Sequence, residues 1–451
     1  MREKIIVRGG SVVLPDAVVV ADVEVIGGRI ERIGQGLEAD ASCTVLEARD
    51  KYVLPGFIDL HTNGIAGFDL TQGVYDPRTN SFDSRREAYI GCLDKALKEY
   101  AKTGVTRAFL TSIAAPVQSL KNVYRHVYEY SQRPDKSAWS QILGGLYNEG
   151  TFMRLAEHRG AHNQAYFNRP TRELFDELQD AAGGLIRVVN VVPEWGDAAL
   201  ELIKYLSAKG IVCAAGHTGA TGIQYGEAVG HGTTLAIHFP NGPTGSSVKP
   251  FDGGGAVETV LRDDRLFAEI IADGYHMDKS YARDTIRRKG YDKIVVITDS
   301  MFPALLDGVT EFSVFGVEGR VGPNGEYLHI ADRKNALFGS SLTMNAAFGN
   351  VLDWLTSPIE GVWYRTHEPV GFEEALVRTS AMCSGNAARV LRMYGPGSGA
   401  SAGMSDHTGS IEKGKCADLV IAGIHSVGGK HRVDINEVIV KGERVLLTGV
   451  N

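Results

Sequence analysis

The chain has 451 residues and a formal net charge of -7, and its hydrophobic and charged fractions are those of a globular protein. This length allows two or three domains, although one barrel could account for more than half of it. The acidic balance excludes the basic surface typical of nucleic-acid binding, and no apolar run is long enough to cross a bilayer.

Two features bear on the cellular compartment. The first seven residues, MREKIIV, lack the apolar core of a signal peptide. The five cysteines are scattered and form no CxxC pair, which favours reduced thiols and disfavours a thiolate metal site. They are Cys43, Cys92, Cys213, Cys383 and Cys416. We therefore expect a cytoplasmic protein with no membrane or nucleic-acid partner.

Both ends of the chain have the alternating, β-branched pattern of short strands. At the N-terminus these are residues 4–8, 11–14, 17–26 and 29–33, and at the C-terminus residues 418–422 and 433–447. We predict that residues 1–54 and 403–451 pair into one small β-sandwich domain. The glycine-rich segment 395–403 falls where the middle of the chain should pass into this domain.

The middle of the chain alternates between strand-like and helix-like segments. Apolar runs occur at 108–111, 142–146, 186–192, 211–215, 234–237 and 294–298, and helix-like segments at 86–103, 171–181, 198–209 and 281–289. This alternation predicts a parallel sheet. The number of units favours a closed (β/α)8 barrel of the TIM type over an open sheet. We predict an α/β protein in which this barrel occupies residues 55–402.

The first residues that could carry chemistry follow an apolar run at 53–60. His61 and Asn63 are two positions apart, so on a strand they point to the same side. Two histidines at this spacing would be a pair of metal ligands. Here only one of the two positions is a histidine, which raises the question of how many metal ions the protein holds.

Four later apolar runs each end in a carboxylate or an imidazole. These residues are Glu149, His217, His238 and Asp299. A barrel builds its active site at the carboxyl ends of its strands, and two histidines with one carboxylate suit zinc or a similar divalent ion. Asp299 would then be the separate carboxylate that moves a proton. Taken singly, each residue is better explained as a helix N-cap or a hydrogen-bonded side chain; taken together, they favour a metal hydrolase.

Several segments also resemble those of a known family. They are residues 55–64, 148–152, 159–163, 216–220, 272–276, 298–299, 339–344 and 409–420. The sequence in these segments is similar to that of the N-acetylglucosamine-6-phosphate deacetylases of the amidohydrolase superfamily. The segments Ala-Asp-Gly-Tyr-His at 272–276 and Gly-Ser-Ser-Leu-Thr-Met at 339–344 look specific to these deacetylases. The resemblance covers nearly the whole chain and implies that the (β/α)8 barrel is distorted.

The resemblance implies a role for each candidate residue. Glu149, His217 and His238 would be metal ligands, Asp299 the catalytic acid and base, His162 a histidine beside the substrate carbonyl, His276 a sugar contact, and Asn241 a residue near the sugar phosphate. The cofactor would be one divalent ion, with Zn²⁺ expected and Fe²⁺, Co²⁺ or Mn²⁺ as alternatives. The substrate would be a small amino sugar, and the protein would be a homodimer.

The chain departs from the family pattern at the phosphate end. Residues 237–243 read Ile-His-Phe-Pro-Asn-Gly-Pro, where the family usually has Thr-His-Leu-Phe-Asn-Ala-Met. Lys249 stands roughly where the family has an arginine that reaches the phosphate from the partner subunit. Lysine keeps the charge but loses the bidentate fork of arginine.

We therefore expect metal-dependent hydrolysis of the N-acetyl group of an amino sugar, foremost N-acetylglucosamine 6-phosphate to glucosamine 6-phosphate and acetate. A related or unphosphorylated N-acetyl amino sugar remains an alternative. Another amidohydrolase activity is disfavoured because Glu149 stands where most of those enzymes have a carbamylated lysine. A non-catalytic scaffold would have lost its ligands, and here every expected position is filled.

The pair His61 and Asn63 bears on the number of metal ions. We call it the half-kept pair, because only one of its two positions is a histidine. In the superfamily, two histidines at this point help to hold a second ion. Asn63 is a poor ligand, and the other three residues suffice for one ion. We predict a single tightly bound metal, with His61 either beside the ligands or the remnant of a weak second site.

Overall fold

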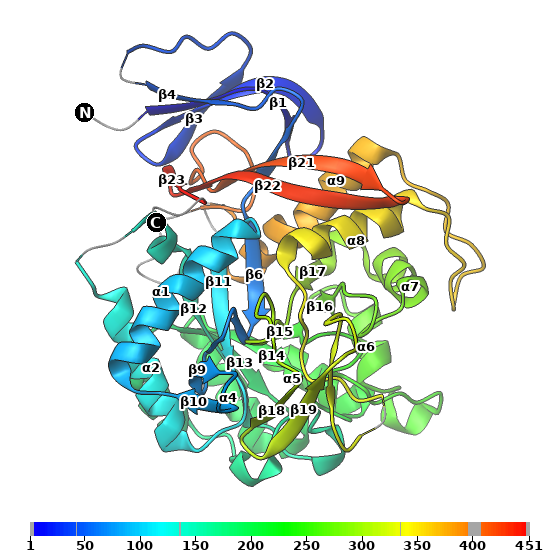
Figure 1. Ribbon diagram of the computed structural model, residues 1–451. Coiled ribbons are helices and arrows are strands. Elements are labelled where there is room, and N and C mark those ends of the chain that lie inside the picture. The colour runs from blue at the N-terminus through cyan, green and yellow to red at the C-terminus, as the bar shows by residue number, and fades with distance from the viewer. Residues whose placement is uncertain (1–3, 42, 135–136, 334, 396–406, 448–451) are drawn as a thin grey trace.

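The computed structural model describes residues 4–41, 43–134, 137–333, 335–395 and 407–447. It consists of a barrel of parallel strands with helices around it, and a mixed sheet made from both ends of the chain (Figure 1). The predicted α/β class, with a barrel and a small terminal β unit, is confirmed. Within the described ranges, no helix is long and apolar enough to cross a membrane.

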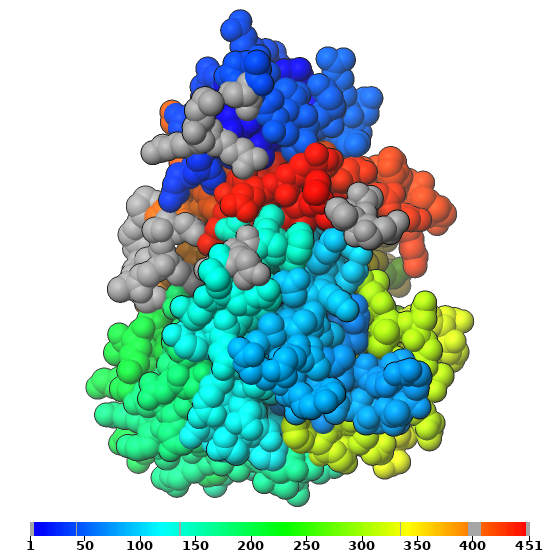
Figure 2. All heavy atoms as spheres, turned by 60° about the vertical axis from the view of Figure 1, so that its left-hand side comes forward, coloured from blue at the N-terminus to red at the C-terminus, as the bar shows by residue number. Residues whose placement is uncertain are grey.

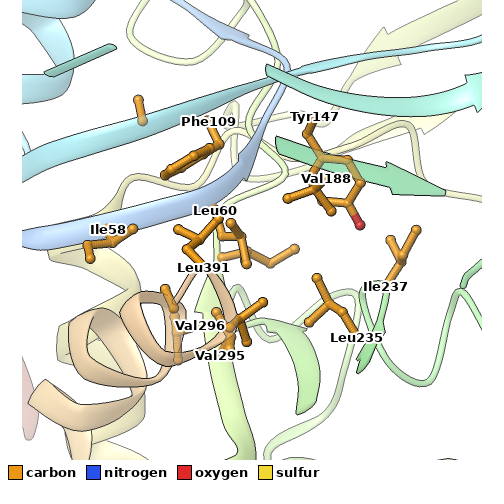
Figure 3. Close-up of a cluster of buried hydrophobic side chains, with 14 of the residues drawn as sticks. Ile58, Leu60, Phe109, Tyr147, Val188, Leu235, Ile237, Val295, Val296 and Leu391 are labelled. Carbon is orange, nitrogen blue, oxygen red and sulfur yellow. The ribbon is translucent and has the colours of Figure 1, made fainter. Parts of the chain in front are cut away.

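Eight parallel strands form the barrel. In spatial order they are β6 (Phe57–Thr62), β11 (Val105–Ser112), β12 (Leu143–Phe152), β13 (Ile186–Val191), β14 (Val212–Ala215), β15 (Thr233–Ala236), β16 (Phe267–Ile271) and β17 (Ile294–Ile297). They are near-continuous apolar runs because both faces of such a sheet are buried. Figure 3 shows part of the resulting core, with side chains such as Leu60, Val188 and Leu235 gathered together.

The barrel closes between its last and first strands. The backbone N–H of Asp299 donates to the His61 carbonyl over 2.9 Å, and that of Asn63 donates to the Ser300 carbonyl over 2.7 Å. The Thr298 hydroxyl donates to the buried Asp59 carboxylate over 2.6 Å. These bonds bring the carboxyl ends of β6 and β17 together, so His61 and Asp299 lie at the same end of the barrel.

The helices lie around the barrel and after its last strand. They are α1 (Arg86–Lys102), α2 (Val117–Ser131), α3 (Arg172–Ala181), α4 (Asp197–Ala208), α5 (Gly222–His231), α6 (Ala256–Arg262), α7 (Lys279–Lys289), α8 (Met344–Thr356), α9 (Phe372–Ser380) and α10 (Asn386–Val390). All four predicted helices are confirmed with ends within two residues. The start of α3 shows why: the Thr171 hydroxyl accepts from the backbone N–H of Leu174 over 3.2 Å, a regular N-cap.

The terminal sheet joins both ends of the chain. Its strands are β1 (Lys4–Val13), β2 (Val18–Ile26), β3 (Arg29–Gly34), β4 (Cys43–Glu47), β5 (Tyr52–Pro55), β21 (Leu419–Val427), β22 (Lys430–Val440) and β23 (Glu443–Val445). The order is β23-β22-β21-β5-β1-β2-β3, with β4 on β1. Figure 2 shows these segments, in blue and red, stacked on one end of the barrel.

Strand β1 runs through two of the predicted strands without a break. Its register shifts between Val7 and Gly10, and it pairs with β4 before the shift and with β5 after it. A side chain at Gly10 would come within 2.6 Å of Val53, so this approach requires glycine. Both halves of the sheet share one apolar core. The boundaries at 54, 55, 402 and 403 stay predictions, and residues 396–403 of the predicted linker lie outside the described residues.

Two small antiparallel sheets were not predicted. One consists of β7 (Gly64–Ile65), β8 (Phe68–Asp69), β9 (Gly73–Asp76) and β10 (Ser81–Asp83), the other of β18 (Glu311–Val314), β19 (Val317–Val321) and β20 (Leu328–Ile330). An apolar cluster that includes Tyr75, Phe302, Phe312 and Phe338 joins them. Both sheets follow barrel strands, and Figure 1 shows β18 and β19 at the end of the barrel opposite the terminal sheet.

A buried ion pair joins the barrel to the terminal sheet. The Arg107 guanidinium lies 3.0 Å from the Asp418 carboxylate, and the two side chains are 4% and 0% exposed. Replacing Arg107 with methionine would leave the Asp418 charge buried without its partner. We expect this change to lower the free energy of unfolding by about 3–5 kcal/mol, measured by urea denaturation of the metal-loaded protein.

Arg432→Met is the matched control. Its ion pair with Asp434 spans 2.8 Å between side chains that are 71% and 41% exposed. Solvent screens such a pair, so its loss should change the free energy of unfolding by less than about 1 kcal/mol. Equal effects of the two substitutions would show that the Arg107 pair does not hold the two parts together.

Candidate active site

Three predicted ligands lie at the carboxyl ends of the barrel strands β12, β14 and β15. Glu149 lies near the C-terminal end of β12, and His217 and His238 follow β14 and β15. The Oε1 atom of Glu149 lies 3.2 Å from Nε2 of His238 and 3.4 Å from Nε2 of His217. All three side chains are buried, and one donor atom of each lies within 4.8 Å of the others. Two imidazoles and one carboxylate fit a divalent ion such as Zn²⁺, with a position left open.

The backbone at this site is unusual. The φ angles of His217, His238 and Asp299 are 55°, 24° and 49°. Residues other than glycine rarely adopt this left-handed region of φ, because it costs free energy that contacts in the surrounding structure must offset. Three such residues at the ends of three barrel strands indicate that the positions of their side chains are specified by the fold.

The surroundings of His217 fix its tautomer. Its Nδ1–H donates to the His158 carbonyl over 2.8 Å, so Nε2 presents a lone pair toward Glu149. A histidine that binds a metal through one ring nitrogen typically donates from the other to a carbonyl oxygen. The His158 loop approaches so closely that a side chain at Gly160, where φ is 53°, would lie 2.5 Å from the imidazole.

His162 has the opposite tautomer. The backbone N–H of Ala114 donates to its Nδ1 over 3.1 Å, so the proton must sit on Nε2. That nitrogen lies 3.5 Å from Oε2 of Glu149. Burial lowers the pKa of His162, which keeps the imidazole neutral. The predicted carbonyl-side histidine is therefore a neutral hydrogen-bond donor at the edge of the ligand cluster.

Asp299 is held by the asparagine of the half-kept pair. The Asn63 amide donates to Oδ1 of Asp299 over 2.6 Å. The other oxygen of Asp299 has no hydrogen-bond or ion-pair partner among the described residues. Asn63 therefore faces the predicted acid and base, and one carboxylate oxygen of Asp299 stays available for a proton.

His61 lies between three carboxylates. Its Nε2 is 3.5 Å from both Glu149 and Asp299, and its Nδ1–H donates to Glu269 over 3.1 Å. Burial opposes a charge on this imidazole, but Glu149 and Glu269 raise its pKa well above the ordinary value. Burial likewise would raise the pKa of Glu149, yet His61 and His162 hold it well below its usual range.

Glu269 was missed by the sequence reasoning. It lies on β16 and is fully buried, and its Oε2 accepts from His61 Nδ1 and from the backbone N–H of His238 over 3.2 Å. It therefore holds both a predicted ligand and the neighbouring histidine in place. A lone carboxylate inside the apolar run Phe267–Ile271 was the available signal, and that run was not among the predicted strands.

The predicted sugar-side residues, His276 after β16 and Asn241 after β15, form a hydrogen-bonded unit with Asp273. His276 donates from Nδ1 to Asp273 over 2.7 Å, and the Asn241 amide donates to the His276 carbonyl over 2.8 Å. Burial would lower the pKa of His276, but Asp273 raises it. The unit fixes where Nε2 of His276 lies, which a sugar-positioning residue requires.

One cavity of about 480 Å³ connects these groups. Among the residues that line it are Asn63, Glu149, His162, His217, His238, Asn241, His276 and Asp299. Tyr275, Arg333 and Phe338 also line it and were not predicted. The volume is that of a small-molecule site. Lys249 lies on an exposed loop outside the cavity of its own chain, so its predicted role depends on a partner subunit.

Comparison with known proteins identifies the family. The model of the Amidohydrolase family matches residues 52–445. The chain belongs to this family. It is 27% identical over 423 residues to the N-acetylglucosamine-6-phosphate deacetylase of Bacillus subtilis. The aligned region covers 91% of this chain and 93% of the relative. It is 28% identical over 328 residues to the N-acetylgalactosamine-6-phosphate deacetylase of Escherichia coli O157:H7, covering 72% of this chain and 79% of the relative.

Solved structures of two deacetylases share the fold. The N-acetyl-D-glucosamine-6-phosphate deacetylase of Mycobacterium smegmatis superimposes with a TM-score of 0.76 at 21% identity, over 98% of this chain and 100% of that one. The Thermotoga maritima deacetylase gives 0.71 at 22% identity, over 98% and 99% of the two chains. The resemblance inferred from the sequence segments is confirmed for this amidohydrolase.

Proposed function

We propose that this amidohydrolase removes the N-acetyl group of an amino sugar, foremost converting N-acetylglucosamine 6-phosphate to glucosamine 6-phosphate and acetate. The observation that carries the proposal is the convergence of Glu149, His217 and His238 with Asp299 and His162 on one cavity. Deacetylases of two 6-phosphorylated sugar epimers among the relatives support the substrate class.

Glu149, His217 and His238 would hold one divalent ion, for which Zn²⁺ is the first candidate. When bound, such an ion lowers the pKa of water and polarises a carbonyl group. Asp299 takes a proton from the attacking water through its free carboxylate oxygen, while Asn63 fixes the other oxygen. His61 then lies beside the ligands, consistent with a one-metal site.

The remaining residues act on the acetamide and the sugar. Nε2–H of His162 donates to the carbonyl oxygen as that oxygen becomes negative. The C–N bond breaks as Asp299 returns its proton to the nitrogen, which leaves the free amine and acetate. His276 and Asn241 position the sugar so that the carbonyl carbon meets the water.

We also propose a cytoplasmic homodimer in which Lys249 of the partner subunit reaches the substrate. On the same loop, Val248 and Phe251 are 99% and 83% exposed, and such apolar side chains favour an interface. The five free cysteines support a reducing compartment.

Acetate release from a panel of compounds tests the function. We expect the highest kcat/KM with N-acetylglucosamine 6-phosphate, compared with its galacto epimer, both unphosphorylated sugars, a hydantoin and an N-acetyl amino acid. Faster hydrolysis of the hydantoin or the N-acetyl amino acid would identify a different amidohydrolase. A purified protein with no bound divalent ion and no turnover would identify a scaffold.

Glu269 offers a prediction about the metal. Glu269→Gln should weaken the carboxylate contact that orients His61 and His238, and we expect the affinity for Zn²⁺ to fall about 10- to 100-fold. Competition with a chelating dye measures it. Glu201→Gln, on the exposed face of α4, is the control and should leave the affinity unchanged. An unchanged affinity for Glu269→Gln would mean that this carboxylate only fills space.

A further inference from the structure

A hairpin at the rim of the cavity carries an arginine at its tip. The chain turns back after β20, where the Ile330 N–H donates to the Ala336 carbonyl over 2.8 Å and the Ala336 N–H donates to the Arg333 carbonyl over 3.3 Å. The Phe338 N–H donates to the Leu328 carbonyl over 3.1 Å at the base. Arg333 is therefore placed by backbone hydrogen bonds on both sides of it.

The base of this hairpin is joined to the strand end that carries the acid and base. The Ser340 N–H donates to the Asp299 carbonyl over 2.8 Å, and the Met301 N–H donates to the Ser340 carbonyl over 2.9 Å. The Ser340 hydroxyl donates to the Thr298 carbonyl over 2.6 Å. Arg333 and Asp299 therefore belong to one connected unit, and both line the cavity.

Among the residues that the structure describes, no carboxylate pairs with the Arg333 guanidinium. Arg333 is half-buried at the cavity wall, and neither it nor Arg159 forms an ion pair within the described part of the chain. Burial lowers the pKa of Arg333, and the charge of Arg159 lowers it further. Glu157, a carboxylate at the same rim, pairs with neither arginine. Two guanidinium groups near each other, neither of them paired with a carboxylate among the described residues, are suited to a bound anion.

We propose that Arg333, supported by Arg159, binds an anionic group on the N-acetyl amino sugar, so that this chain selects anionic substrates with a residue of its own subunit. The inference rests on the proposed deacetylase function. It accounts for the departure at Lys249, because a planar guanidinium on the hairpin supplies the bidentate fork that lysine lacks. A phosphate ester and a carboxylate share the required chemistry. Tyr275, whose ring lies 5.1 Å from that of Tyr327, forms part of the same cavity wall.

The test compares an anionic with a neutral sugar. The wild type should hydrolyse N-acetylglucosamine 6-phosphate faster than N-acetylglucosamine, and Arg333→Gln should lower the ratio of their kcat/KM values about 10- to 100-fold, mainly through KM. Arg333→Lys should restore part of this ratio. N-acetylglucosaminuronic acid is the carboxylate-bearing substrate in the comparison. The site prefers the anion, phosphate or carboxylate, whose substrate loses more kcat/KM in Arg333→Gln.

Arg320→Gln is the matched control, since this arginine lies on β19 of the same small sheet and pairs with Glu311 at 3.1 Å, outside the cavity. It should leave the ratio unchanged. The proposal is overturned if Arg333→Gln lowers turnover of the neutral and anionic sugars equally, if the wild type does not prefer the anionic sugar, or if Lys249→Ala alone removes the preference.

A binding measurement separates this proposal from the proposed function. Calorimetry of zinc-loaded Asp299→Asn protein with N-acetylglucosamine 6-phosphate should show binding that the additional Arg333→Gln change weakens about 10- to 100-fold. If no sugar is deacetylated but this loss is seen, the anion site stands and the deacetylase function fails. If acetate is released but Arg333→Gln does not weaken binding, the anion-site proposal fails and the deacetylase function stands.

Discussion

Asp299→Asn should lower kcat for acetate release about 10³-fold while the protein keeps its metal ion. The asparagine side chain occupies nearly the same space and can still contact Asn63, but it can neither take a proton from water nor return one to the amine. General acid and base catalysis contributes about 10²- to 10⁴-fold in enzymes, and here one carboxylate performs both steps. Steady-state kinetics and metal analysis of the same preparation measure the two quantities.

Asp307→Asn is the control for this change. Asp307 is exposed on the loop that follows the strand end of Asp299, so its replacement should leave kcat unaltered. Near-full turnover by Asp299→Asn with metal bound would mean that another group moves the proton.

Glu149→Gln should remove tight metal binding and with it nearly all activity. Glu149 is the centre of the cluster, because its Oε1 contacts His217 and His238 and its Oε2 lies 3.5 Å from His61 and His162. A neutral amide cannot balance a divalent charge beside several imidazoles. Losing a contribution of several kcal/mol from the ion corresponds to a fall in kcat/KM of about 10³-fold or more.

Metal content after dialysis, measured beside kcat/KM, tests this second prediction. Glu201→Gln again serves as a control, because it removes an exposed carboxylate far from any of the cluster contacts. Retention of one ion per chain by Glu149→Gln, with unchanged affinity, would show that the ion is held elsewhere.

The sequence allowed the ligand cluster to be predicted for a simple physical reason. Buried parallel strands are apolar runs, and all their carboxyl ends meet at one edge. The polar residues that follow those runs must therefore lie close together. Glu149, His217, His238 and Asp299 were predicted in this way, and the structure places all four on one cavity.

The contacts that support the cluster could not be predicted, because they join residues far apart in the sequence. Asn63 and Asp299 are 236 positions apart, and His61 and Glu269 are 208 apart. The small sheets that hold the cavity wall have strands of two to five residues, too short to give a clear alternating pattern. Arg333 lies at the tip of one such hairpin, and only the fold brings it to the cavity.

The structure also changes the interpretation of the half-kept pair. Asn63 donates to Asp299, and His61 is bound by Glu269. Both side chains therefore have defined partners beside Glu149, His217 and His238, the one group of candidate ligands found among the described residues. This arrangement supports the proposal of a single metal ion.

A zinc titration of chelator-stripped protein tests this account most directly. Acetate release from N-acetylglucosamine 6-phosphate is measured after each addition of Zn²⁺. The account predicts that activity rises in proportion to added zinc and reaches its plateau at one ion per chain. A plateau only at two ions, or one tightly bound ion without acetate release, would contradict it.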